Sequence, residues 1–294
     1  GIGSLNSVVL VTTSATGFSP DSSGTLTTSL RTFWKLDEAS GARLDSYVNA
    51  INLTPGGSPL PSNASGIVGN ACDFVATNSQ TLLAPVDTAL LNAGGINFTV
   101  ACWVFFNNTA DQPFFSKFDP TGNNLEYSLE HGESTGNVRR TRFRVSNDGV
   151  STTSVFANTF GAPSTGTWYL LFGMHDSANG ILSIQVNTFS ADSIAYTSGI
   201  RSSSATLVIG GRDSTNEYTE SRIDEAGFWS KVLTVQERRD LWNGGSGNTY
   251  TSGVSNTGFG MFDFGAGFAS GTPLRWLVVS GGTAVYASSN RGVS

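Results

Sequence analysis

The carboxylates that could do chemistry are concentrated in the segment 126–133, which reads Glu-Tyr-Ser-Leu-Glu-His-Gly-Glu. A retaining glycoside hydrolase needs a nucleophile and an acid about 5–5.5 Å apart. In a strand, Glu126, Ser128 and Glu130 would share one face, because side chains alternate with a period of two. The middle position is a serine, and no base-activated nucleophile accompanies the glutamates. We therefore predict no catalytic residues and no enzymatic activity.

Three arginines, Arg140, Arg142 and Arg144, follow at the same period of two. A hairpin turning around Thr135-Gly136 would set them roughly opposite the stripe of Glu130, Ser128 and Glu126. Cross-strand ion pairs on a solvated face explain both stripes. The alternative is that the arginines bind an acidic ligand, and they are the candidate ligand-binding residues.

The remaining reactive side chains are sparse. His131 and His175 are isolated, with no Ser/His/Asp arrangement or zinc spacing around them, and we expect both in surface loops. Cys72 and Cys102 are the only cysteines and lie in apolar strand patterns. Two buried free thiols are favoured over one disulfide, although the sequence leaves both open.

The composition favours many short strands over long helices. Only 13% of the 294 residues are charged, and Gly occurs 35 times. The net charge of −6 and a pI near 4.9 argue against a nucleic-acid partner. No apolar run is long enough for a membrane span. The first residue is Gly and not Met, which indicates a processed product or a fragment.

Strand patterns recur between polar turns and divide the chain into three parts. The run 98–106 is almost continuously apolar, as in a strand buried on both sides, and 182–186 alternates. One helix is expected, with Thr234 as N-cap, Glu237 completing a capping box and Gly244 closing it. We assign 1–31 to an arm or linker, 32–245 to one β-sandwich domain and 246–294 to a β extension.

The strand-rich part carries five segments of a known pattern in the correct order. These are Phe33-Trp-Lys-Leu-Asp-Glu-Ala-Ser-Gly41, Gly66-Ile-Val-Gly-Asn-Ala-Cys-Asp-Phe74, Phe98-Thr-Val-Ala-Cys-Trp-Val104, Trp168-Tyr-Leu-Leu-Phe-Gly173 and Ile223-Asp-Glu-Ala-Gly-Phe-Trp229. The chain thereby resembles the laminin-G-like, concanavalin A-like jelly-roll domains of bacterial and phage surface proteins. The resemblance implies an all-β fold of two antiparallel sheets. Related glycoside hydrolases carry a Glu-x-Asp-x-x-Glu array, which this chain lacks at Ser128.

The resemblance also implies a structural Ca²⁺. In similar jelly rolls, the aspartate equivalent to Asp224 and an acidic residue of the opening segment often hold the ion together with backbone carbonyls. The equivalent opening acids here are Asp37 and Glu38. The alternative is that Asp224 and Asp37 accept backbone N–H bonds in tight turns.

The family's functions are mostly recognition, which indicates an extracellular protein on a virion or a bacterial cell. We predict a non-catalytic recognition or assembly component that forms homo-oligomers or binds other surface proteins. The alternative is a carbohydrate-binding module of a larger secreted enzyme or adhesin. Two tryptophans in apolar strands, Trp103 and Trp168, are expected in the core and not as sugar platforms.

The terminal segments should be held by a partner surface, either the sandwich of the same chain or that of a neighbouring subunit. The arm contains the strand pattern 8–11, and the extension contains a hairpin pattern at 276–286. The extension is too short to enclose its own large apolar residues, namely Phe259, Met261, Phe262, Phe264, Phe268, Trp276 and Tyr286. Exchange of these segments between subunits would fit an assembly protein.

Overall fold

The computed structural model describes the backbone of residues 8–13, 16–86, 88–132, 138–212, 215–252, 255–260, 277–279 and 283–287, and the side chains of those between 16 and 252. Two units are present, Phe18–Tyr250 and the pair of terminal segments Gly1–Gly17 and Thr251–Ser294. No helix in the described ranges is long and apolar enough to cross a membrane.

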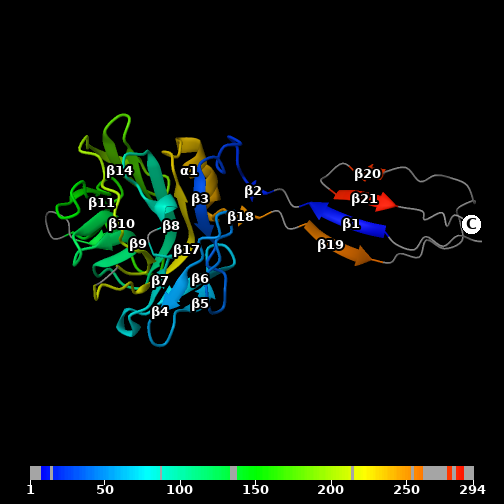
Figure 1. The fold of residues 1–294 in the computed structure, drawn as a ribbon, viewed down its shortest axis with the longest axis horizontal. Helices are drawn as coiled ribbons and strands as arrows, with labels where there is room; N and C mark the ends of the chain where they lie inside the picture. The colour runs from blue at the N-terminus through cyan, green and yellow to red at the C-terminus, as the bar shows by residue number, and fades with distance from the viewer. Residues whose placement is uncertain are drawn as a thin grey trace, which may run out of the picture. The chain divides into compact units, whose positions relative to one another are not determined.

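The larger unit is a sandwich of two antiparallel sheets (Figure 1), which confirms the predicted fold class. The seven-stranded sheet has the order β12 (Thr153–Phe156), β11 (Arg140–Val145), β10 (Asn124–Gly132), β9 (Gln112–Asp119), β16 (Leu207–Ile209), β7 (Thr81–Leu83) and β4 (Thr54–Gly56).

The eight-stranded sheet contains both ends of the predicted motif series. Its order is β15 (Asp192–Ala195), β14 (Ile181–Val186), β13 (Trp168–Asp176), β8 (Phe98–Phe106), β17 (Ser221–Trp229), β6 (Asn70–Phe74) and β5 (Ser62–Ser65), with β3 (Leu30–Trp34) also paired to β17. The β3–β17 pairing sets Ala226 opposite Trp34, so the opening and closing segments lie side by side.

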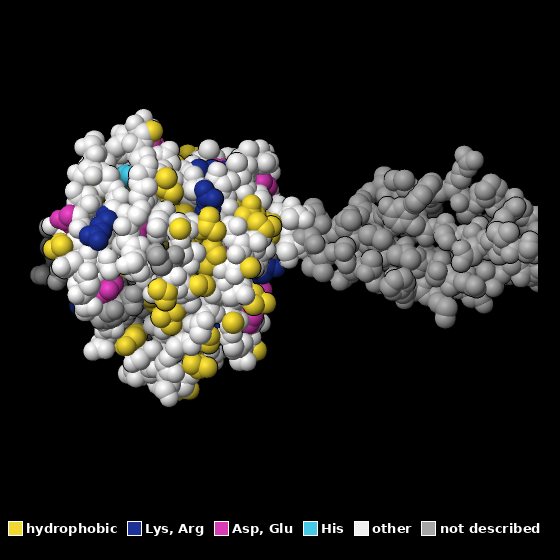
Figure 2. Space-filling view, viewed as in Figure 1, with side chains coloured by type: hydrophobic (Ala, Val, Ile, Leu, Met, Phe, Trp, Pro, Cys, Tyr) yellow, Lys and Arg dark blue, Asp and Glu magenta, His cyan; other side chains and the backbone are white. Residues whose placement is uncertain are grey.

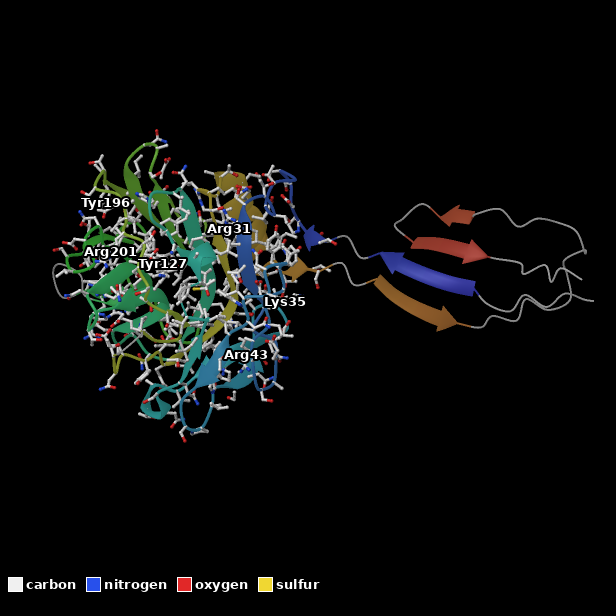
Figure 3. The ribbon with its side chains drawn as sticks, in the orientation of Figure 1. Arg31, Lys35, Arg43, Tyr127, Tyr196 and Arg201 are labelled. Atoms are coloured by element: carbon white, nitrogen blue, oxygen red, sulfur yellow. The ribbon has the colours of Figure 1, made fainter. Side chains whose placement is uncertain are left out.

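The core between the sheets is built by the alternation that the sequence shows. On β8, Phe98, Val100 and Cys102 face this core, which they share with Tyr127 of β10 and Phe143 of β11. Figure 3 shows Tyr127 inside the sandwich, where its hydroxyl donates to the carbonyl oxygen of Leu91 at 2.9 Å. Burial of these large apolar side chains supplies the main driving force for folding.

A second apolar layer covers the outer face of the eight-stranded sheet. Ala101 and Trp103 of β8 pack there with Leu170 of β13, beneath Leu241 and the segment around Leu26. Leu241 belongs to α1 (Val235–Trp242), which Figure 1 shows beside β3. The strand 98–106 is therefore buried on both sides, as predicted.

The predicted helix has its predicted start. Thr234 is the N-cap and completes a capping box with Glu237. The helix ends one residue earlier than expected, because Asn243 and not Gly244 is the first left-handed residue, with φ of 46°. Short 3₁₀ turns lie at Ala76–Asn78, Ala89–Leu91 and Asn243–Gly245.

The two predicted core tryptophans differ. Trp103 is 1% exposed, which confirms the prediction. Trp168 is only half-buried, because it begins β13 at the margin of the sheet, where it packs on Phe105 with ring centroids 5.5 Å apart. Cys72 and Cys102 are buried free thiols, as favoured.

The terminal segments pair with one another. A four-stranded sheet has the order β19 (Ser255–Gly260), β1 (Val8–Thr13), β21 (Thr283–Ala287) and β20 (Leu277–Val279). The β20–β21 pairing confirms the predicted hairpin. A separate two-stranded sheet joins β2 (Gly17–Phe18) to β18 (Tyr250–Thr251). The large apolar side chains of the extension lie outside the described residues.

Candidate ligand-binding face of the seven-stranded sheet

The predicted stripes of glutamate and arginine are neighbours on the seven-stranded sheet. In the β10–β11 register, Glu130 stands opposite Arg142 and Ser128 opposite Arg144. Arg140 stands opposite Gly132, one pair beyond the last carboxylate. Residues 133–137, including Glu133 and the expected turn, lie outside the described residues. The cross-strand ion pairs at Glu130 are therefore confirmed, in a register shifted from the expected one.

Glu130 lies at the centre of the polar face. It accepts from Arg142 Nε and Arg212 Nη2, from Arg144 Nη2 at 3.1 Å and from the Ser128 hydroxyl at 2.6 Å. Burial alone would raise its pKa, but the charges of Arg212, Arg144 and Arg142 outweigh burial and hold the pKa at about 2. The expectation of a solvated face was wrong at this point, because the guanidinium groups cover the fully buried Glu130.

Glu126 does not join the arginines. The pairing of β10 with β9 shifts register between Leu125 and Tyr127, which turns Glu126 away from the stripe. Its carboxylate pairs with Lys117 Nζ at 2.8 Å and accepts from the backbone N–H of Ser203 at 2.8 Å. The two glutamates thus belong to separate buried networks. Both carboxylates are fully buried.

Arg212 is the functional candidate that sequence reasoning missed. It follows β16, 82 residues after Glu130, and no periodicity links the two positions. Phe118 of β9 supports both Arg144 and Arg212, whose guanidinium carbons lie 4.4 and 5.3 Å from the ring centroid. Glu130 and Phe118 together hold these two guanidinium groups in place.

A hollow of about 330 Å³ adjoins this cluster. Leu83 and Val208 form part of its floor, since their neighbours Leu82, Leu207 and Ile209 face the core. The other six lining side chains all carry hydroxyl, amide or guanidinium groups, and the full lining is Ser79, Thr81, Leu83, Val208, Arg212, Thr215, Asn216 and Tyr218. This volume is at the lower end of the range for small-ligand sites.

Charged side chains are sparse on the face of Phe18–Tyr250 that Figure 2 shows. The few Lys, Arg, Asp and Glu side chains visible there are scattered among hydrophobic and neutral groups. The cluster of Arg142, Arg144 and Arg212 is therefore an unusual concentration of charge for this chain, in which 13% of residues are charged.

The two histidines are not loop residues, and that prediction was wrong. His131 lies in β10 and His175 in β13, each 1% exposed. His131 packs against the ring of Phe106 at 5.3 Å, and His175 packs against Phe98 at 6.0 Å. Burial lowers the pKa of both, that of His131 to about 4. Their rings fill space in the apolar interior as neutral groups.

Asp224 of β17 accepts backbone N–H bonds in a tight turn. Its carboxylate receives the N–H groups of Ile67 at 2.8 Å, Val68 at 3.2 Å and Glu225 at 2.9 Å. Gly66 allows this approach, because a Cβ at that position would stand 2.4 Å from the Asp224 carboxylate. These contacts match the amide-acceptor alternative raised by the sequence.

The other proposed calcium ligands are engaged in the same way. Asp37 accepts from the N–H of Asn70 at 2.7 Å, and Glu38 from the N–H of Leu44 at 2.7 Å. In the described ranges, no group of three or more His, Cys, Asp or Glu side chains is arranged to hold a metal ion. These N–H groups direct partial positive charge at the carboxylate oxygens, which is the arrangement of the amide-acceptor alternative.

Comparison with known proteins places the fold in a family. The sequence profile of the concanavalin A-like lectin/glucanases superfamily matches residues 77–237, more than half of the chain. The chain belongs to this superfamily. Three of the five motif segments fall within the matched range, and those at 33–41 and 66–74 precede it. A search of curated proteins finds no matching relative.

Solved structures agree on the fold. Domain 4 of AbnA, an extracellular arabinanase of Geobacillus stearothermophilus in complex with arabinotriose, is 18% identical over 72% of this chain and 97% of its own, with a TM-score of 0.54. The binding domain of Paraclostridial mosquitocidal protein 1 is 13% identical, with a TM-score of 0.59. That of botulinum neurotoxin serotype D is 12% identical, with a TM-score of 0.53.

The coverage differs between these neighbours. Each toxin match covers 74% of this chain, which spans about half of each toxin domain, 53% and 51%. The arabinanase domain matches over almost its whole length. At these identities the similarity is one of fold alone.

Proposed function

We propose that this chain is a non-catalytic recognition domain of an extracellular protein, and that it binds carbohydrate in the hollow beside Arg212. The observation that carries the proposal is the junction of this hollow with a fixed cluster of guanidinium donors. Sugar sites combine hydroxyl-binding polar groups with an apolar surface for the ring. Thr81, Asn216 and Tyr218 offer both kinds of contact. Membership of a lectin-containing superfamily and the arabinotriose complex of the fold neighbour support this choice.

The two glutamate networks support recognition without hydrolysis. A retaining enzyme needs two free carboxyl groups across the substrate. Glu130 is neutralised by arginines and Glu126 by Lys117. Incubation of the pure protein with β-glucans, galactans and arabinans should release no reducing sugar. Release that disappears in Glu130→Gln would overturn this part of the proposal.

A glycan array tests binding directly. Wild type should bind a limited set of oligosaccharides, and Tyr218→Ala, which removes a ring from the hollow, should weaken the binding of all of them. Tyr47→Ala is the matched control, because Tyr47 packs with the α1 layer on the other sheet. Absence of binding to any glycan, or equal loss in both variants, would contradict a sugar site in the hollow.

A role in assembly on a virion or cell exterior is the second candidate. It is favoured by the strand pairing between the termini, where β1 lies between β19 and β21. Because β1 comes from the N-terminal end and pairs with two strands of the C-terminal end, β1 of one copy can also pair with these strands of a second copy. The mass of the intact protein in solution tests this candidate, because a monomer at all concentrations would exclude strand exchange.

A further inference from the structure

We propose that the sugar bound at this face carries an anionic group, a carboxylate or a sulfate, and that Arg212 binds that group. This inference rests on the proposed carbohydrate-binding function and names its ligand class. Arg212 is the only arginine among the lining residues of the hollow and also belongs to the Glu130 cluster.

The charge balance of the cluster favours an anion. Three guanidinium groups, those of Arg142, Arg144 and Arg212, face the two carboxylates of Glu130 and Glu217. Among the described residues, the cluster therefore carries one positive charge in excess. Arg144 shows the effect, since burial and the charges of Arg212 and Arg142 lower its pKa to about 10 despite the attraction of Glu130. An anion placed here would relieve this repulsion.

Glu217 occupies the position that a ligand anion would take. It pairs with Nη1 of Arg212, while Nη2 of the same guanidinium binds Glu130. Glu130 is fully buried, whereas the Glu217 side chain is 52% exposed. Asn216 and Tyr218, the neighbours of Glu217, line the hollow. An exposed ion pair contributes little to stability, so an incoming carboxylate or sulfate can replace Glu217.

The guanidinium groups are already held in position in the absence of a ligand. Phe118 packs against the guanidinium groups of Arg144 and Arg212, and Glu130 binds Nη2 of Arg212, so that Nη1 is directed at the exposed Glu217 position. Preorganised donors lose little conformational entropy on binding. Planar guanidinium groups bind carboxylate and sulfate oxygens in pairs, which ammonium groups do not.

The experiment uses oligosaccharides in matched neutral and anionic forms with the full-length protein. The anionic probes are oligogalacturonate, oligomannuronate, sialyllactose and sulfated galactan fragments. The neutral probes are galactan fragments, mannan fragments and lactose. We expect at least one anionic probe to bind about tenfold or more tightly than its neutral counterpart, with affinity falling as salt rises. The carboxylated and sulfated arms identify which anion is preferred.

Two variants should move affinity in opposite directions. Arg212→Gln should weaken the anionic probe by about 10- to 100-fold, the effect of losing a charge-assisted hydrogen bond. Glu217→Gln should strengthen the same probe, because it removes the competing carboxylate. Arg239→Gln is the control for net charge, since this exposed arginine lies on α1, over the other sheet. If Arg212→Gln folds poorly, Arg212→Lys and Glu217→Gln carry the test.

The outcomes separate the two proposals. If neutral and anionic forms bind equally, or Arg212→Gln and Arg239→Gln lose equal affinity, the anion inference is wrong and carbohydrate binding stands. If Glu217→Gln weakens the anionic probe, Glu217 is itself a ligand-binding group and the displacement argument fails. If no probe binds, neutral or anionic, both proposals fail.

Discussion

The ring of Trp103 in β8 stacks on that of Trp242 at the end of α1, with centroids 5.0 Å apart and planes 17° apart. Trp103 is 1% exposed, and Trp242 covers it from the solvent side. The contact attaches the only α-helix in the described ranges to the eight-stranded sheet.

We therefore expect Trp103→Ala to lower the free energy of unfolding by about 3–5 kcal/mol, since a large buried ring leaves a cavity. Trp168→Ala, at a half-buried site, should lower it by less. Urea denaturation measures both. A Trp103→Ala protein as stable as wild type would show that the α1 layer does not depend on this ring.

Glu130 should make the protein sensitive to strong acid. Its folded pKa of about 2 lies below the ordinary value of 4.5. Its contribution is therefore complete above pH 4.5 and is lost as pH falls towards 2, in total about 3 kcal/mol. Glu130→Gln should remove this slope and destabilise the protein at pH 7, because it leaves the arginines unpaired. Glu217→Gln is the exposed control. Equal acid slopes in wild type and Glu130→Gln would contradict the assignment.

His131 should make the stability of the protein depend on pH between about 4 and 6.5. Burial lowers its folded pKa from 6.5 to about 4, so below pH 6.5 the unfolded chain binds a proton that the folded chain excludes. Stability should fall by about 1.4 kcal/mol per pH unit across this range. His131→Asn should lose that slope in denaturation curves at pH 7, 6 and 5. If His131→Asn keeps the full pH dependence of stability, another group causes the effect.

Glu225 is expected to destabilise the protein at neutral pH. Burial and then the neighbouring Asp224 carboxylate raise its pKa well above 4.5, and these effects outweigh the lowering by the Thr249 hydroxyl. A raised acid pKa means that stability is lost as pH rises above 4.5. Glu225→Gln should therefore raise the melting temperature at pH 7.5 in chelator and have little effect at pH 4.

Calcium titration is the control for Glu225→Gln. Wild type should melt at the same temperature in chelator and in excess CaCl₂, because Asp224, Asp37 and Glu38 accept N–H groups. A Ca²⁺-dependent rise in melting temperature that is lost in Glu225→Gln would restore the calcium site implied by the family resemblance.

Deletion of 253–294 removes β19 and β21, both neighbours of β1. We expect this truncated chain to self-associate, because β1 then has two unpaired edges. Removal of 1–15 together with 253–294 should restore a soluble protein, since Phe18–Tyr250 contains its own core. Light scattering and melting temperature distinguish the two forms. If the first deletion behaves like wild type, the terminal strands are a passive extension.

Much of the fold could be predicted from sequence because it depends on local periodicity. The alternation of 182–186 and the apolar run 98–106 decided which side chains face the core. The capping box at Thr234 and Glu237 is a contact between residues three apart, so the sequence alone located it. The five motif segments indicated the family because they occur in the same order along the chain as the strands of the family's sheets.

The candidate site depended on contacts that no local pattern contains. A register shift in β10 separated Glu126 from Glu130, and only the packed sheet shows that shift. Arg212 reaches Glu130 from 82 residues away because β9 and β16 are neighbours, and Phe118 lies beneath it. The histidines were misplaced for the same reason, since burial is a property of the assembled sheets. Sequence periodicity determined which face the side chains of regular strands occupy, whereas strand pairing across the chain, with its register shifts, determined which charges meet.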